Sequence, residues 1–237
     1  MPVTSSRQQR TLFVHVGTHK TGSTSIQRLL LESRRRISGH GIKVIVDHPS
    51  HADEPANCSS IAHAFVRPDL ITPSRLSGRQ VADFGSVGVI DHFVEQVRTE
   101  GHASFVLSAE AFCYLRTRDE RKNLLRVLAR LKCAVVPIVY FRRDADWRTS
   151  WASQIGKMNH TRLFRERNPG RLTVLDDWYF DRRAIADFWR SVSPLTRVFD
   201  YDGEVAEHGS VVPSFLDAVG LPQSLDSDRY FLNRRSA

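Results

Sequence analysis

The segment from Leu12 to Gln27, LFVHVGTHKTGSTSIQ, constrains the fold more than any other part of this chain. A short apolar run typical of a strand enters a turn bounded by Gly17 and Gly22, and an amphipathic helical pattern follows it. Such a strand–turn–helix unit directs backbone N–H groups and the positive end of the helix dipole toward one point. The sequence therefore predicts an anion site at the start of the helix.

The residue types inside this turn also suit an anion. Lys20 supplies a cation in a chain where arginine far outnumbers lysine, and the next residues add hydroxyl donors. The spacing Gly17-x4-Gly22 resembles a nucleotide P-loop, but Ser23 stands where such a loop carries its Lys. This departure counts against an ordinary nucleoside-triphosphate site.

The rest of the chain alternates short apolar runs with longer amphipathic segments. Strands are predicted at Leu12–Val16, Ile42–Val46, Ser104–Leu107, Ala134–Phe141 and Thr196–Phe199. This alternation favours an α/β fold with a mainly parallel sheet of about five strands and helices on both faces. Pro137 lies inside the fourth run, where it predicts a bulge or an edge.

We expect a single domain over residues 1–237, with a flexible N-terminus at 1–10. Residues 48–100 contain several Pro, Gly and Ser and predict a largely irregular connection with short helices on the substrate side. Residues 159–178 are expected to help shape an acceptor pocket, although they carry no recognisable motif.

The net charge of +8 has two interpretations, an anionic partner or a general preference for arginine. No apolar run is long enough for membrane insertion, and no secretory signal precedes the first strand. Three widely spaced cysteines suggest a reducing compartment, so a cytoplasmic protein is expected. Aromatic and basic residues are not interleaved as in an RNA-binding sheet, so no nucleic-acid partner is expected. The oligomeric state cannot be deduced.

The run Lys20-Thr-Gly-Ser-Thr resembles the 5′-phosphosulfate loop of sulfotransferases that use 3′-phosphoadenosine 5′-phosphosulfate (PAPS), in particular the bacterial branch of that family. Family members also carry an Arg at the end of a strand and a Ser eight residues later, which hold the 3′-phosphate. Arg142 and Ser150 have this spacing, and Arg143 is the alternative to Arg142.

The resemblance implies a P-loop-like three-layer sandwich and transfer of a sulfonate group from PAPS to a hydroxyl or amine acceptor, a carbohydrate or a small metabolite. Lys20 would stabilise the leaving oxygen in an in-line transfer. The expected cofactor contacts are His19, Lys20, Thr21, Gly22, Ser23, Thr24, Ser25, Arg142 and Ser150. The terminal Asn233, Arg234 and Arg235 are a further, weaker match to family members. No metal is expected.

A general base must accept the proton of the acceptor. Glu110 follows the predicted strand that begins at Ser104, where parallel strands present their ligands, and it is the first candidate. His48, which follows the second predicted strand, is the alternative.

Two other functions stay open. A kinase or NTPase with an atypical P-loop would use Asp47 to hold Mg²⁺, since Asp47 also follows an apolar strand. A non-catalytic nucleotide-binding protein would keep the loop without the chemistry.

Overall fold

A computed structural model describes residues 9–47, 56–77, 87–158 and 171–225. Its strands form one sheet in the order β2-β3-β1-β4-β5, and all four pairings between neighbours are parallel. The strands are β1 (Thr11–Val16), β2 (Ile42–Val44), β3 (Ser104–Ala109), β4 (Ala134–Phe141) and β5 (Arg197–Asp200). The predicted α/β class with a five-stranded parallel sheet is confirmed.

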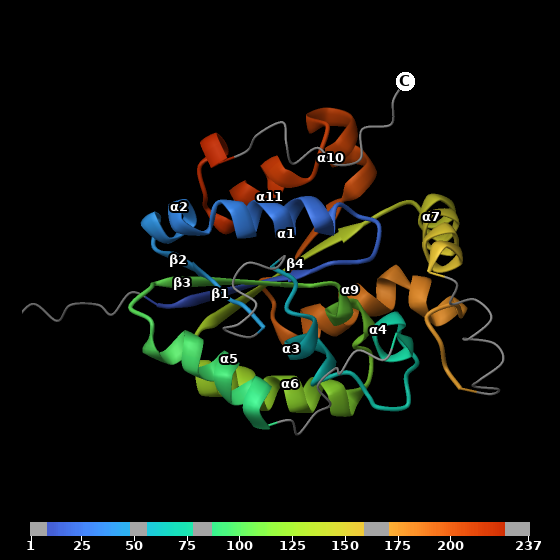
Figure 1. Ribbon diagram of the computed structural model, residues 1–237, viewed down its shortest axis with the longest axis horizontal. Helices are drawn as coiled ribbons and strands as arrows, with labels where there is room; N and C mark the ends of the chain where they lie inside the picture. The colour runs from blue at the N-terminus through green and yellow to red at the C-terminus, as the bar shows by residue number, and fades with distance from the viewer. Residues whose placement is uncertain (1–8, 48–55, 78–86, 159–170, 226–237) are drawn as a thin grey trace, which may run out of the picture.

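Helices cover both faces of this sheet, which gives three layers (Figure 1). One face carries α1 (Ser23–Glu32), α2 (Arg34–Gly39), α10 (Tyr201–His208) and α11 (Val212–Val219). The other carries α3 (Ser59–His63), α5 (Val87–Thr99), α6 (Arg118–Leu131) and α9 (Arg182–Val192). Short elements complete the described chain: α4 (Pro73–Leu76), η2 (Glu110–Tyr114), η3 (Asp177–Phe180) and η4 (Gln223–Leu225).

The alternation of side chains along β1 explains why both faces are covered. Leu12, Val14 and Val16 belong to the apolar core beneath α5, α6 and α9, whereas Phe13 packs against the core beneath α1 and α11. Each face of the strand is apolar, so each needs a helical layer to exclude water.

The carboxyl ends of the strands lie on the right in Figure 1, where helix α7 (Asp144–Lys157) follows β4. Central strand β1 lies between β3 and β4, and α1 and α6, which follow β1 and β3, pack on opposite faces of the sheet. In open α/β sheets this divergence leaves a crevice at the carboxyl ends of the strands, where ligands bind. The topology therefore places the predicted loop at the position where a ligand site is expected.

Pro137 produces no bulge, because β4 pairs with β1 in unbroken register from Ala134 to Val139. The N–H of Ala134 points toward β1, so the nitrogen of Pro137, three residues later, faces the opposite side. Pairing with β5 begins only at Ile138. The missing donor thus falls on a stretch of β4 that has no strand partner on that side, which was the other half of the prediction.

Other boundaries differ from the prediction. Strand β2 ends at Val44 rather than Val46, and β3 continues to Ala109. Within 48–100, residues 87–99 form the regular helix α5, whose apolar side packs in the core, so the expectation of an irregular connection is wrong there. Arg10 lies inside the supposedly flexible N-terminus, but its side chain donates to the carbonyls of Val97 and Glu100.

Among the described residues, no helix has both the length and the apolar character needed to cross a bilayer. The three cysteines are free thiols, of which Cys58 and Cys113 are buried.

Candidate functional site

A pocket of about 490 Å³ lies where the loop after β1 meets the end of β3. One wall of the pocket, formed by this loop and the end of β3, consists of residues that the sequence singled out, namely His19, Lys20, Gly22, Ser23, Thr24 and Glu110. The opposite wall consists of Asn57, Pro73, Ser74, Trp151, Gln154 and Met158. The structure thus brings the predicted cation, the predicted base and the start of α1 together around one cavity.

The loop between β1 and α1 is held by its own hydroxyl groups. The side chain of Thr18 donates to the carbonyl of Tyr140 in β4 at 2.6 Å, and the side chain of Thr21 donates to the carbonyl of Thr18 at 2.5 Å. Both threonines are fully buried. The hydroxyl of Thr21 therefore stabilises the loop from inside, and only its backbone is left for the predicted cofactor contact.

Two backbone conformations in this loop are unusual. Lys20 has φ 70°, a left-handed conformation that costs a non-glycine residue about 1 kcal/mol, and Gly22 has φ 77°. A Cβ on Gly22 would lie 2.6 Å from Cγ2 of Val211. Only glycine fits this position, and the fixed turn directs Lys20 into the pocket.

Gly22 is also the N-cap residue of α1, and it provides no side-chain acceptor for the first amides of that helix. The first turn of α1 contains no acidic residue. By contrast, Thr117 caps α6 and Asp181 caps α9. An uncapped helix start with a lysine in the preceding turn can bind an anion through backbone N–H groups.

The remaining hydroxyls near this helix start differ in their access to the pocket. Ser23 and Thr24 line it, but Ser25 is 5% exposed and is not among its lining residues. The side chain of Ser23 donates to the carbonyl of Thr18 at 3.5 Å and lies beside Glu110, since both side chains adjoin Gly17.

Glu110 is the first residue of η2, directly after β3. Its side chain is 27% exposed, and the loss of hydration raises the pKa of the carboxyl group to about 7. The neighbouring Ser23 hydroxyl and the charge of Lys20 favour the carboxylate but do not offset this effect. A carboxyl group that titrates near neutral pH is suited to accepting a proton.

His19 lies in an aromatic cage that the sequence did not predict. Its Nδ1 is 2.6 Å from the hydroxyl of Tyr179, its Nε2 is 3.3 Å from the hydroxyl of Tyr114, and its ring lies 4.4 Å from the ring of Trp151. Burial lowers the pKa of His19 to about 3, so the ring is neutral. His19 is thus part of the structural support of the pocket as well as of its surface.

The second motif lies outside this pocket. The side chain of Arg142, directly after β4, is 16% exposed, with Nε 3.8 Å from Oδ1 of Asp202 and no hydrogen-bond partner for Nε among the described residues. Its guanidinium lies 5.4 Å from the ring of Tyr201. That ring also lies close to Gly22, since a Cβ there would be 3.7 Å from Cε2 of Tyr201. Tyr201 thus connects Arg142 with the start of α1.

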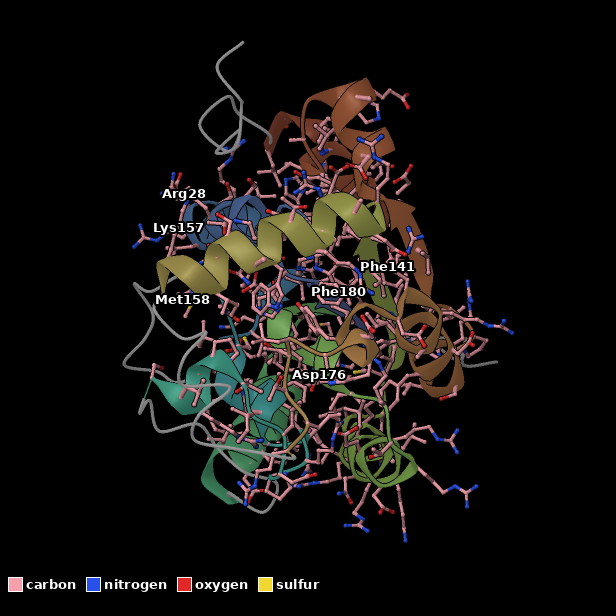
Figure 2. All side chains as sticks on the ribbon, turned by 90° about the vertical axis from the view of Figure 1, so that its right-hand side faces the viewer. Arg28, Phe141, Lys157, Met158, Asp176 and Phe180 are labelled. Atoms are coloured by element: carbon pink, nitrogen blue, oxygen red, sulfur yellow. The ribbon has the colours of Figure 1, made fainter. Side chains whose placement is uncertain are left out.

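Arg143, the alternative to Arg142, is 75% exposed and pairs with Asp146 at 3.0 Å. Ser150 lies half-buried in the middle of α7, away from the pocket lining. Figure 2 views the molecule from the carboxyl ends of the strands and shows α7 crossing the front, with Met158 directly after its last residue. Arg142 therefore lies on the side of the loop that faces α10, whereas no contact joins Ser150 to Arg142 within the described residues.

Two predicted residues need separate comment. His48, the alternative base, lies outside the described residues. Asp47 uses both carboxylate oxygens to accept the backbone N–H groups of Ser60 and Ile61, at 2.6 and 2.9 Å. It therefore stabilises the start of α3, and within the described chain no cluster of three or more His, Cys, Asp or Glu is arranged to hold a metal.

The opposite wall of the pocket was missed because its residues come from distant segments. Trp151 has the i, i+4 spacing of a core stripe with Trp147, and that interpretation is correct, since both are buried. Gln154 lies three residues beyond Trp151, on the same side of α7, so it could have been predicted to share its surroundings. Nothing in the sequence indicates that Asn57 or Ser74 faces the loop.

A larger open hollow of about 910 Å³ lies at the amino ends of the strands, next to Arg10, His102 and Lys132. It contains neither the loop nor Glu110, and the basic residues beside it lie close to the C-terminal ends of α5 and α6, where positive charge complements the helix dipole. The smaller pocket is therefore the candidate site.

Comparison with known proteins supports the fold. No family model and no curated protein matches the chain. In structure, the chain is similar to a sulfotransferase from Alicyclobacillus acidocaldarius, with a TM-score of 0.54 and 14% identity over 92% of this chain and 83% of that one. A protein of the PezAT chromosomal toxin-antitoxin system of Streptococcus pneumoniae matches with a TM-score of 0.41 and 14% identity over 90% and 78% of the two chains, too distant for any argument. The first similarity shows a shared fold.

Proposed function

We propose that this protein is a sulfotransferase that moves a sulfonate group from PAPS to the hydroxyl or amine group of a small acceptor. The observation that carries this proposal is the position of Lys20 and Glu110 in one pocket, at the uncapped start of α1. The resemblance of the loop to the phosphosulfate loop, together with the shared fold, supports a phosphosulfate as the anion.

The described residues fit the two phosphate groups of PAPS. The backbone of the loop and the hydroxyls of Ser23 and Thr24 would hold the 5′-phosphate. Arg142, whose buried Nε makes no hydrogen bond within the described structure, would bind the 3′-phosphate. Tyr201 adjoins both places, since its ring lies close to the guanidinium of Arg142 and to Gly22.

In the proposed reaction the acceptor oxygen or nitrogen attacks sulfur while the bond between sulfur and the bridging phosphate oxygen breaks. The acceptor proton passes to the Glu110 carboxylate, and Lys20 stabilises the negative charge on the leaving oxygen. Positioning and charge stabilisation provide most of the rate enhancement in such loose in-line transfers. No step requires a metal ion.

The first experiment is a calorimetric titration with 3′-phosphoadenosine 5′-phosphate, in parallel with ADP and with ATP plus Mg²⁺. We expect metal-independent binding that requires the 3′-phosphate and is weakened in Arg142→Ala. A preference for ATP with Mg²⁺ would support the kinase alternative and overturn the proposal.

A further inference from the structure

His19 is neutral and touches one phenol hydroxyl at each ring nitrogen. A neutral imidazole carries one proton, so one nitrogen donates a hydrogen bond and the other accepts one. Nδ1 lies 2.6 Å from the Tyr179 oxygen, whereas the Tyr114 oxygen lies 3.3 Å from Nε2. The shorter contact, to Tyr179, is the stronger constraint on the tautomer.

Burial raises the pKa of the Tyr179 phenol well above its ordinary value, so the hydroxyl keeps its proton and can donate it to Nδ1. The thiol of Cys113, 3.8 Å away, is a second weak donor beside the same nitrogen. With Nδ1 as acceptor, the ring proton lies on Nε2. This nitrogen is 3.3 Å from the Tyr114 hydroxyl, which can accept its proton, and 4.0 Å from Oε2 of Glu110, which competes for it.

Once Glu110 is ionised, above about pH 7, the opposite tautomer would turn an unprotonated nitrogen toward a carboxylate. Two lone pairs facing each other are unfavourable in a pocket from which much water is excluded, whereas an N–H facing a carboxylate is favourable. The Tyr179 hydroxyl beside Nδ1 and the negative charge of Glu110 near Nε2 therefore select the same tautomer, with the proton on Nε2.

We propose that Tyr179 and His19 are positioning residues for Glu110: the Tyr179 hydroxyl fixes the tautomer of His19, and the Nε2–H of His19 orients the Glu110 carboxylate toward the acceptor. The role of Glu110 as base rests on the proposed function, but the tautomer and its effect on Glu110 do not. The gap of 4.0 Å is longer than a hydrogen bond, and we expect it to close when an acceptor occupies the pocket.

Other groups around Glu110 act on the same carboxyl group. Lys20 from the loop and Ser23 from α1 favour its charged form. Cys113 and Tyr114 follow Glu110 within η2, Tyr179 faces it from η3, and all three are protonated because burial raises their pKa. The neutral ring of His19 adds a donor to this set without adding a charge.

The first test is a ¹⁵N NMR spectrum of histidine-labelled protein near pH 7.5, with His19 assigned by its loss in His19→Gln. The two ring nitrogens have distinct shifts when protonated and unprotonated. The proposal requires the proton on Nε2 and none on Nδ1. A proton on Nδ1, or a charged ring, would overturn it.

The second test removes the Tyr179 hydroxyl. In Tyr179→Phe only the charge of Glu110 still favours this tautomer, so we expect partly mixed ¹⁵N shifts for His19. Because the carboxylate loses a donor, the midpoint of the Glu110 titration should rise by about half a pH unit. ¹³C NMR of labelled glutamate measures this midpoint, with Glu110→Gln as the assignment.

Tyr140→Phe is the matched control. Tyr140 is also fully buried and its hydroxyl bonds to Oγ of Ser214 at 3.1 Å, but it lies on the other side of the sheet from His19. It should leave both readouts unchanged. If Tyr179→Phe folds and behaves like Tyr140→Phe, the proposal is wrong. If Tyr179→Phe does not fold, the ¹⁵N spectrum of the native protein still tests the proposal, because it reports the tautomer of His19 directly. Neither measurement needs turnover, so a failed sulfotransferase assay would not be mistaken for a failed positioning role.

Discussion

The side chains of Ser23 and Glu110 lie against the same face of Gly17, so the first turn of α1 and the end of β3 meet at one point. A Cβ on Gly17 would lie 2.6 Å from Oγ of Ser23 and 3.1 Å from Cγ of Glu110. Only a residue without a side chain allows the two groups to meet. The start of α1, where we propose that phosphate binds, and the candidate base are therefore mechanically coupled.

Replacement of Gly17 by Ala should separate Ser23 from Glu110. We expect at least a tenfold loss in binding of 3′-phosphoadenosine 5′-phosphate, because the loop must shift by several tenths of an ångström to relieve the contact. Gly156→Ala in α7 is the control: a Cβ there meets nothing within 4 Å. This variant should bind normally and be about 1 kcal/mol more stable, since Ala is the better helix former. Equal binding by both variants would contradict the coupling.

The Glu110 carboxyl group predicts a pH dependence with a defined sign. Burial raises its pKa to about 7 in the folded protein, against an ordinary value of 4.5. Only the carboxylate accepts a proton, so the rate of transfer should rise with pH and level off above about pH 7.5. Glu110→Gln should lose most of the activity at every pH. An unchanged pH profile in that variant would exclude Glu110 as the base.

The same pKa has a consequence for stability. Between about pH 4.5 and 7 the folded state binds more protons at Glu110 than the unfolded state does, so this group makes the protein less stable as the pH rises. Glu110→Gln resembles the protonated form and avoids that loss. We expect the variant to unfold at a higher temperature than the wild type at pH 8 and at a similar temperature near pH 4. A lower melting temperature at pH 8 would contradict this assignment.

Lys20→Ala should reduce sulfonate transfer by about 10²- to 10³-fold, the usual effect of removing one donor that stabilises transition-state charge. Alanine carries the same Cβ as lysine and meets the same strain in this left-handed conformation. The alanine variant should therefore keep the fold of the loop and lose only the cation. Lys157→Ala removes the same charge from an exposed residue at the end of α7 (Figure 2). A comparable loss in both variants would point to general attraction of an anion rather than to a specific role.

The sequence predicts the order of the elements and the loop because both depend on local patterns. Strand β1, Gly17, Gly22 and the start of α1 lie within one short segment, and Glu110 follows a strand whose direction is set by the parallel sheet. The loop is fixed by the hydrogen bond from Thr18 to Tyr140 and by the packing of Gly22 against Val211. These partners are distant in sequence, so no local pattern reveals the left-handed conformation of Lys20 or the inward direction of the Thr21 hydroxyl.

The aromatic cage is a second example. His19, Tyr114 and Tyr179 come from the loop, η2 and η3, far apart in the sequence. The sequence predicts His19 only as a cofactor contact, because its aromatic partners are selected by the packing of three elements. Asp47 shows the reverse case: a carboxylate after a strand has the pattern of a metal ligand, but the chain folds back so that α3 uses both oxygens.

Arg142 and Arg143 are adjacent in sequence but differ in burial, so they should differ in function. Arg142→Ala should weaken binding of 3′-phosphoadenosine 5′-phosphate by about tenfold or more and leave ADP almost unaffected, because ADP lacks the 3′-phosphate. Arg143→Ala should change both affinities by less than about twofold, since its side chain is 75% exposed and pairs with Asp146. The reverse order would assign the 3′-phosphate to Arg143.

Asp202 introduces a charge that opposes this binding. Its Oδ1 lies 3.8 Å from Nε of Arg142, and its Oδ2 accepts the backbone N–H of Arg143 at 2.7 Å. Asp202→Asn keeps an oxygen for that N–H but removes the negative charge beside the expected 3′-phosphate. We expect the affinity for 3′-phosphoadenosine 5′-phosphate to rise roughly threefold at low salt, with less gain at high salt because ions screen the repulsion. Calorimetry at two ionic strengths measures this. If binding instead became weaker at both, Asp202 would be needed to orient Arg142, and the ion pair would be part of the binding site rather than its competitor.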